Sequence, residues 1–164
     1  MTRAYLAFTE KGLALAQKLA SALPGTVARC GHGGPGLADW AAEQFAHADA
    51  LIFVGAVGIA VRAIAPHCRS KAVDPAVVVL DECGHFAVPI LSGHLGGAND
   101  LARALAAVCG AVPVITTATD ANGVFAVDAW ARHQNCAVLE PERIKRVSSR
   151  PVSYTHLRAH ATLA

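Results

Sequence analysis

Residues 51–55 are Leu51-Ile52-Phe53-Val54-Gly55, a continuous apolar run that ends at a glycine. Such a run, without polar alternation, is typical of a strand buried on both faces of a parallel sheet, because helices cover both faces of that sheet. A short helix is predicted to follow over 59–65 and to end before Pro66. Strand, glycine turn and helix in succession predict one unit of an α/β fold.

Strand-like and helix-like segments alternate on both sides of this run. Thr9 is a predicted N-cap for a helix that Pro24-Gly25 ends. Asn99 is a predicted cap for a helix that runs to Val108, with Gly110 as its stop. The alternation predicts a doubly wound, Rossmann-like three-layer α/β sandwich with a mostly parallel sheet. Its other predicted helices are 37–46 and 127–133. Its other predicted strands are 4–8, 26–29, 76–80, 86–91 (returning from a turn at 81–84) and 112–116, with 51–54, 76–80 and 112–115 central.

Composition excludes several classes of function. Aromatic residues make up 5% of the 164 residues and the formal charge is +2, which argues against a nucleic-acid partner. The five cysteines are odd in number and none pair as Cys-x-x-Cys, so we expect a reducing, cytoplasmic environment. Thr9-Glu10-Lys11 interrupts the apolar start, which argues against a signal peptide. The most apolar stretch, 48–65, contains Asp49 and Arg62, so no membrane partner is expected.

Three loops rich in glycine or polar residues each follow a predicted strand. The first contains Gly55 and Gly58, where backbone N–H groups can approach a ligand closely and a helix start favours anions. A tight strand-to-helix turn that needs only small residues is the alternative and explains these glycines at least as well.

The second loop, 92–100, concentrates a hydroxyl, an imidazole, an amide and three glycines between a strand and a helix. Ser92, His94 and Asn99 supply the polar groups, and Gly96 and Gly97 lie between them. His94 is a candidate general acid or base, because an imidazole titrates near neutral pH. Alternatively, His94 bonds a backbone group and only orders the loop.

The third loop follows the strand at 112–116. Thr116, Thr117 and Asp120 can orient a polar ligand, although 120–123 is also an ordinary turn sequence. We predict that all three loops open on one cleft, because parallel strands place their carboxyl ends at one edge of a sheet.

The remaining motifs in the sequence do not predict a cofactor or metal site. Residues 31–36 match G-x-G-x-x-G as a string but lack the following acidic residue of a dinucleotide-binding fingerprint. Cys83 with His85, and His67 with Cys68, are close pairs without the spacing of a zinc site, so no metal site is predicted.

Four stretches together resemble the CbiG family of cobalamin biosynthesis, in the family's order: 53–66, 70–82, 89–99 and 113–123. The resemblance implies a hydrolase that opens the lactone of cobalt-precorrin-5A, a cobalt corrinoid, and releases acetaldehyde. It implies no further cofactor, because the substrate itself carries the cobalt. It also implies a carboxyl-terminal domain as partner, so the alternative is a corrinoid-binding module that acts with a site on that domain.

The resemblance assigns no catalytic residues, and chemistry supplies the candidates. Lactone hydrolysis benefits from a base and from donors to an oxyanion. His94 is the candidate base, with Asp120 next. N–H groups near Gly96 and Gly97 are the candidate donors, and Arg62 can pair with a substrate carboxylate.

The resemblance also suggests a division of the chain. Residues 1–135 are predicted to be the amino-terminal α/β domain, and 136–149 the start of a linker region. Residues 150–164 lack periodicity and resemble translated vector sequence, so we expect this tail not to be part of the folded domain.

Overall fold

The structure is a computed structural model that describes residues 1–123, 130–131, 133–134 and 136. The chain divides into two compact units, Met1–Ile115 and Thr116–Ala164. The predicted helix at 127–133 lies largely outside the described residues, and the predicted tail at 150–164 lies wholly outside them.

Strands and helices alternate along the first unit, as the sequence predicts. Thr9 caps the first helix, α1 (Glu10–Ala22), as expected, because its hydroxyl accepts the N–H of Gly12 at 3.0 Å. In chain order the elements are β1 (Arg3–Ala7), α1 (Glu10–Ala22), β2 (Thr26–Arg29), α2 (Leu37–His47), β3 (Ala50–Val54), α3 (Val57–Ile64), the 3₁₀ turn η1 (Ala65–His67), β4 (Ala76–Leu80), β5 (Phe86–Leu91), α4 (Ala98–Cys109) and β6 (Val112–Pro113).

The described strands form one sheet in the order β2-β1-β3-β4-β5-β6. The four strands from β2 to β4 are mutually parallel. β5 returns antiparallel to β4, with Leu80 opposite Ala87 and Val77 opposite Leu91, and β6 runs parallel to β5. The predicted mostly parallel sheet is therefore confirmed, with its direction reversed at β5.

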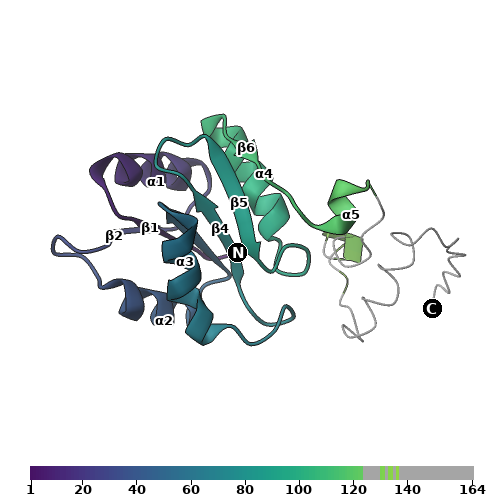
Figure 1. Cartoon of the computed structure of the whole chain (residues 1–164), viewed down its shortest axis with the longest axis horizontal. Helices are drawn as coiled ribbons and strands as arrows, with labels where there is room; N and C mark the ends of the chain where they lie inside the picture. The colour runs from purple at the N-terminus through teal and green to yellow at the C-terminus, as the bar shows by residue number, and fades with distance from the viewer. Residues whose placement is uncertain (124–129, 132, 135, 137–164) are drawn as a thin grey trace, which may run out of the picture. The chain divides into compact units, whose positions relative to one another are not determined.

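Two helices cover each face of the sheet, which gives the predicted three layers. Figure 1 shows α1 and α4 on one side of the strands and α2 and α3 on the other. Side chains alternate along the strands, so Ile52 and Val78 pack with α1 and α4, while Phe53 and Val79 pack with α2 and α3. β3 and β4 are buried at every position, which explains their continuous apolar sequence.

Two predicted elements differ from those observed. The strand predicted at 112–116 shrinks to Val112–Pro113 at the edge of the sheet, where Val112 is 57% exposed, so it is not central. Proline supplies no N–H to a strand ladder, which confines Pro113 to an edge. The cap of α4 is Gly97 in a left-handed conformation, with no side-chain cap bond, so the prediction that Asn99 caps this helix is wrong.

Candidate functional site

The loop that joins β5 to α4, residues 92–99, is a compact structure held by its own backbone. The N–H of Ala98 donates to Ser92 O at 3.1 Å, and that of Asn99 donates to Gly93 O at 3.0 Å. The N–H of Gly97 donates to His94 O at 3.0 Å. The predicted oxyanion donor at Gly97 is thus already engaged inside the loop.

The glycines of this loop are required by close contacts. A Cβ added at Gly96 would lie 2.4 Å from Ser92 Cβ, and one at Gly93 would lie 2.9 Å from Asn99 Oδ1. Gly97 has a φ of 84°, and Ser92 has a φ of 55° although it carries a side chain. A non-glycine residue held in the left-handed region of backbone angles destabilises the fold by about 1–3 kcal/mol. The contacts and backbone angles therefore restrict which residues the loop can accept at these positions.

Ser92 connects this loop to the segment that precedes β4. Its hydroxyl donates to Asp74 O at 2.9 Å. The Asp74 side chain is buried and accepts the N–H of Arg69 on both carboxylate oxygens, at 3.0 Å each. Sequence reasoning did not single out Asp74; the acidic residue directly before Pro75 and a buried strand was its only sign.

Two hollows share several lining residues, and one of them borders this loop. One measures about 430 Å³ and includes Leu95 and Gly96 in its lining, and the other measures about 370 Å³ and includes His67 and Arg69. Both are lined by Phe45, Ala46, Val73 and Asp74. Because Asp49 and Asp74 precede β3 and β4, the hollows lie at the amino-terminal edge of the parallel strands. Their size is in the range of small-molecule sites.

The predicted site residues of the first loop lie at the opposite, carboxyl-terminal edge. Gly55 donates its N–H to Leu80 O at 2.8 Å, and a Cβ there would lie 2.7 Å from the Phe8 ring. Phe8 thus packs on Gly55 at the point where the strand order reverses, between β1 and β3. Packing explains this glycine without a ligand.

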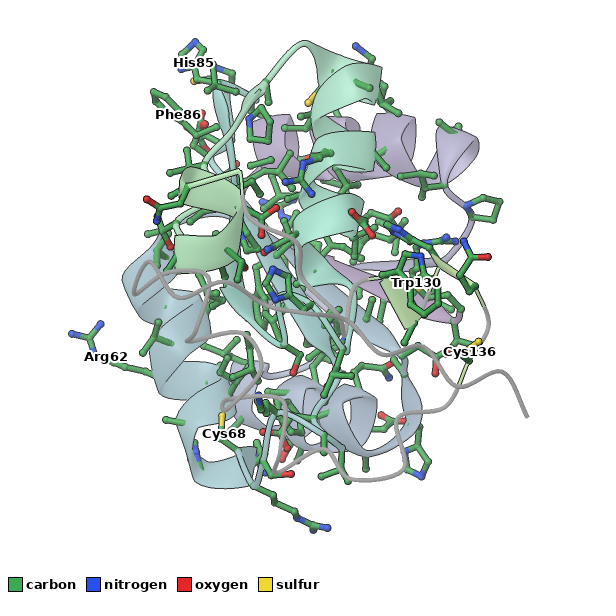
Figure 2. All side chains as sticks on the ribbon, turned by 90° about the vertical axis from the view of Figure 1, so that its right-hand side faces the viewer. Arg62, Cys68, His85, Phe86, Trp130 and Cys136 are labelled. Carbon is green, nitrogen blue, oxygen red and sulfur yellow. The ribbon has the colours of Figure 1, made fainter. Side chains whose placement is uncertain are left out.

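Arg62 lies in the last turn of α3 and is turned outward. Its guanidinium donates to Gly58 O at 3.3 Å within α3, and Figure 2 shows the side chain projecting away from the ribbon. Arg62 lines neither of the two hollows described above.

The prediction that the loops converge on one cleft is wrong for the first two. β5 runs antiparallel to β4, so its carboxyl end lies opposite Val77, at the start of β4. The Ser92–Asn99 loop is thereby carried to the amino-terminal edge, while Gly55 and Gly58 stay at the carboxyl-terminal edge. His94, Ser92, Gly96, Gly97 and Asn99 remain together.

The third loop belongs to the second unit and is described by itself. The Thr117 hydroxyl donates to Asp120 Oδ2 at 2.6 Å, across the start of the single-turn helix α5 (Ala118–Ala121). This contact brings Thr117 and Asp120 together next to Thr116. Whether these residues join the Ser92–Asn99 loop stays a prediction.

Similarity to known proteins shows which family the chain belongs to. The family model described as cobalamin synthesis G N-terminal, CbiG_N, matches residues 39–120. The chain belongs to the CbiG family. The CbiG match contains every predicted site residue, from Gly55 to Asp120.

Curated relatives extend the match to CbiG proteins of known name. A cobalt-precorrin-5A hydrolase of Salmonella typhimurium is 44% identical over 164 aligned residues, which cover 92% of this chain and 46% of the relative. The cobalt-precorrin-5A hydrolase of Priestia megaterium is 42% identical over 103 residues, or 63% of this chain and 28% of the relative. The chain thus spans less than half the length of the curated CbiG relatives it matches.

A solved structure supports the fold of this CbiG chain. The crystal structure described as a cobalamin biosynthesis protein G homolog from Sulfolobus solfataricus aligns with a TM-score of 0.60 at 21% identity, covering 99% of this chain and 51% of that one. In the part of the chain that the structure describes, no helix combines the length and apolar character needed to cross a membrane.

Proposed function

We propose that the protein to which this chain belongs is a cobalt-precorrin-5A hydrolase and that the Ser92–Asn99 loop is part of its substrate site. The single observation that carries the proposal is the 44% identity to the Salmonella relative of that name, over 92% of this chain. The reaction is the opening of the lactone by water, followed by carbon–carbon cleavage that releases acetaldehyde. The cobalt belongs to the substrate, so the proposal needs no further cofactor.

The geometry supports a place for the reacting group beside the loop. Leu95 and Gly96 line the hollow of about 430 Å³. His94, half-buried and next to Leu95, is the proposed general base for attack of water on the acyl carbon. The hydrogen-bonded backbone of the loop would help to position this residue for the reaction.

A cationic side chain beside the same hollows fits the carboxylates of a corrinoid. His67 and Arg69 line the hollow of about 370 Å³, and Asp74 fixes the backbone at Arg69. An Arg side chain can bind a carboxylate through two parallel hydrogen bonds. We therefore propose Arg69, ahead of the outward-turned Arg62, as the carboxylate-binding residue.

The alternative is a corrinoid-binding module whose catalytic groups lie in another part of the protein. This chain covers 46% of the Salmonella relative, so the catalytic groups can lie in the part of the protein that it does not cover. It predicts that loop substitutions weaken binding and turnover together.

The test is to incubate this chain, and a chain extended to the length of the Salmonella relative, with cobalt-precorrin-5A. Acetaldehyde release and corrinoid binding are then measured for both. Release by the extended chain supports the proposed reaction, and release by this chain alone would place the catalytic groups within it. An extended, folded chain that binds the corrinoid but releases no acetaldehyde contradicts the hydrolase assignment.

A further inference from the structure

The turn between β4 and β5 gathers three side chains with different metal-binding atoms. The carboxylate of Asp81, the thiol of Cys83 and the imidazole of His85 offer ligand atoms that all lie within 4.8 Å of one another. His85 Nδ1 lies 3.6 Å from Asp81 Oδ1. Among the residues that the structure describes, this is the one group of three or more such side chains so close together.

The backbone of this turn is held in place by Asp81 itself. Its Oδ1 accepts the N–H of Cys83 at 2.9 Å, and its Oδ2 accepts those of His85 and Phe86 at 2.9 and 2.8 Å. The Asp81 carboxylate is therefore held in a fixed position by the backbone of the turn.

Two hydrogen bonds from the start of helix α1 also hold the turn in place. Thr9 donates to Glu82 Oε2 at 2.7 Å, and Lys11 Nζ donates to Cys83 Sγ at 2.9 Å. Lys11 is exposed, so its ammonium group can turn into solvent when a cation approaches the sulfur. The three ligand side chains thus project from a backbone that is already ordered.

A mixed set of sulfur, nitrogen and oxygen ligands favours some metal ions over others. Zn²⁺ and Co²⁺ bind thiolate, imidazole and carboxylate together, whereas Mg²⁺ and Ca²⁺ prefer oxygen alone. Ligand bonds to Zn²⁺ measure about 2.0–2.3 Å, so the three side chains must draw together by roughly an ångström. Cys83 and His85 are exposed and have room to do so, and Figure 2 shows His85 projecting from the tip of its turn.

We propose that Asp81, Cys83 and His85 form a binding site for Zn²⁺ or a similar divalent transition-metal ion, with the fourth position open to water or an external ligand. The site lies beyond the end of β4 at the carboxyl-terminal edge of the parallel strands. The Ser92–Asn99 loop lies at the other edge, so the proposed metal site is separate from the proposed hydrolase site and does not depend on it.

The test uses the full chain, reduced and free of metal, titrated with Co²⁺ alone. Coordination of a thiolate to Co²⁺ gives a charge-transfer absorption band, which we expect to saturate at one equivalent. Cys83→Ser should abolish this band. The matched controls Cys68→Ser and Cys136→Ser remove other exposed thiols and should retain it.

Zn²⁺ affinity, measured by competition with Co²⁺, tests the second ligand. His85→Ala should weaken binding by at least the roughly tenfold that loss of an outer-shell partner costs. Far-UV circular dichroism would verify that each variant is folded. The proposal is overturned if the unsubstituted chain gives no band, if Cys83→Ser keeps it, or if His85→Ala binds Zn²⁺ as tightly as the unsubstituted chain.

Discussion

His94 is the side chain on which the proposed chemistry depends most. It is the one imidazole in the Ser92–Asn99 loop, and its own carbonyl accepts the N–H of Gly97, so its backbone position is fixed. In a chain extended to the length of the Salmonella relative, His94→Ala should lower acetaldehyde release by about 10²–10⁴-fold if the imidazole is a general base.

Corrinoid binding by the same variant separates the possible roles of His94. It should weaken much less than turnover, because the substrate carboxylates keep their partners. Turnover that survives within a few-fold would mean that His94 only orders the loop and that Asp120 is the next candidate. A parallel loss of binding and turnover would favour the corrinoid-binding module.

Gly96 is a position where one methyl group should disrupt the site. Its added Cβ would meet the Ser92 Cβ at 2.4 Å and the Ser92 carbonyl oxygen at 2.9 Å. We expect Gly96→Ala to lower the free energy of unfolding by about 1–3 kcal/mol, the usual cost of overpacking. Urea denaturation would measure it.

Gly58→Ala is the matched control for that substitution. Gly58 lies in α3, and the nearest atom to its added Cβ is the flexible end of Arg62 at 3.4 Å. Alanine favours a helix over glycine by roughly 0.5–1 kcal/mol, so this variant should be neutral or more stable. Equal destabilisation by both substitutions would show that the close contact at Gly96 has no particular effect.

At the scale of the elements, most of the first unit is predictable from the sequence. Continuous apolar runs predict β3 and β4, and the Thr9 cap together with the Pro24-Gly25 stop predicts α1. The turn at 81–84 and the strand returning from it are both predicted, and together they imply an antiparallel pair. The single-cleft prediction failed because it treated that strand as parallel.

The candidate site is less predictable than the elements. The glycines and His94 are visible in the sequence as an unusual cluster. The hydrogen bond from the Ser92 hydroxyl to the Asp74 carbonyl oxygen, however, joins residues 18 positions apart, and it depends on the register between β4 and β5. Alternation of apolar residues does not specify that register, so Asp74 and the hollow beside it emerge only from the fold.

The central and edge strands should differ sharply in their sensitivity to one substitution. Val78 is fully buried in β4, whereas Val112 in β6 is 57% exposed. Val78→Ala should cost roughly 2–3 kcal/mol, from two lost methyl groups and the cavity they leave. Val112→Ala should change stability by no more than about 0.5 kcal/mol. Equal costs in urea denaturation would contradict the edge position of β6.

At the scale of the whole molecule, the carboxyl-terminal segment is predicted not to contribute to stability. Residues from Arg150 onward show no helical or strand periodicity in the sequence. A chain that ends at Ser149 should therefore unfold at the same temperature, within error, in a calorimetric scan. A decrease of several degrees would show that the segment packs against the folded protein.

The reversal of direction at β5 also bears on how the chain folds. Leu80 pairs with Ala87 a few positions later, whereas Arg3 pairs with Ala50 across a helix, a strand and another helix. Closing a short loop costs less entropy than closing a long one, so the β4–β5 hairpin should form early and the parallel pairings later. Conservative substitutions such as Val79→Ala in the hairpin should then slow refolding, while Leu6→Ala in β1 should mainly speed unfolding. Stopped-flow measurements in urea would reveal the order.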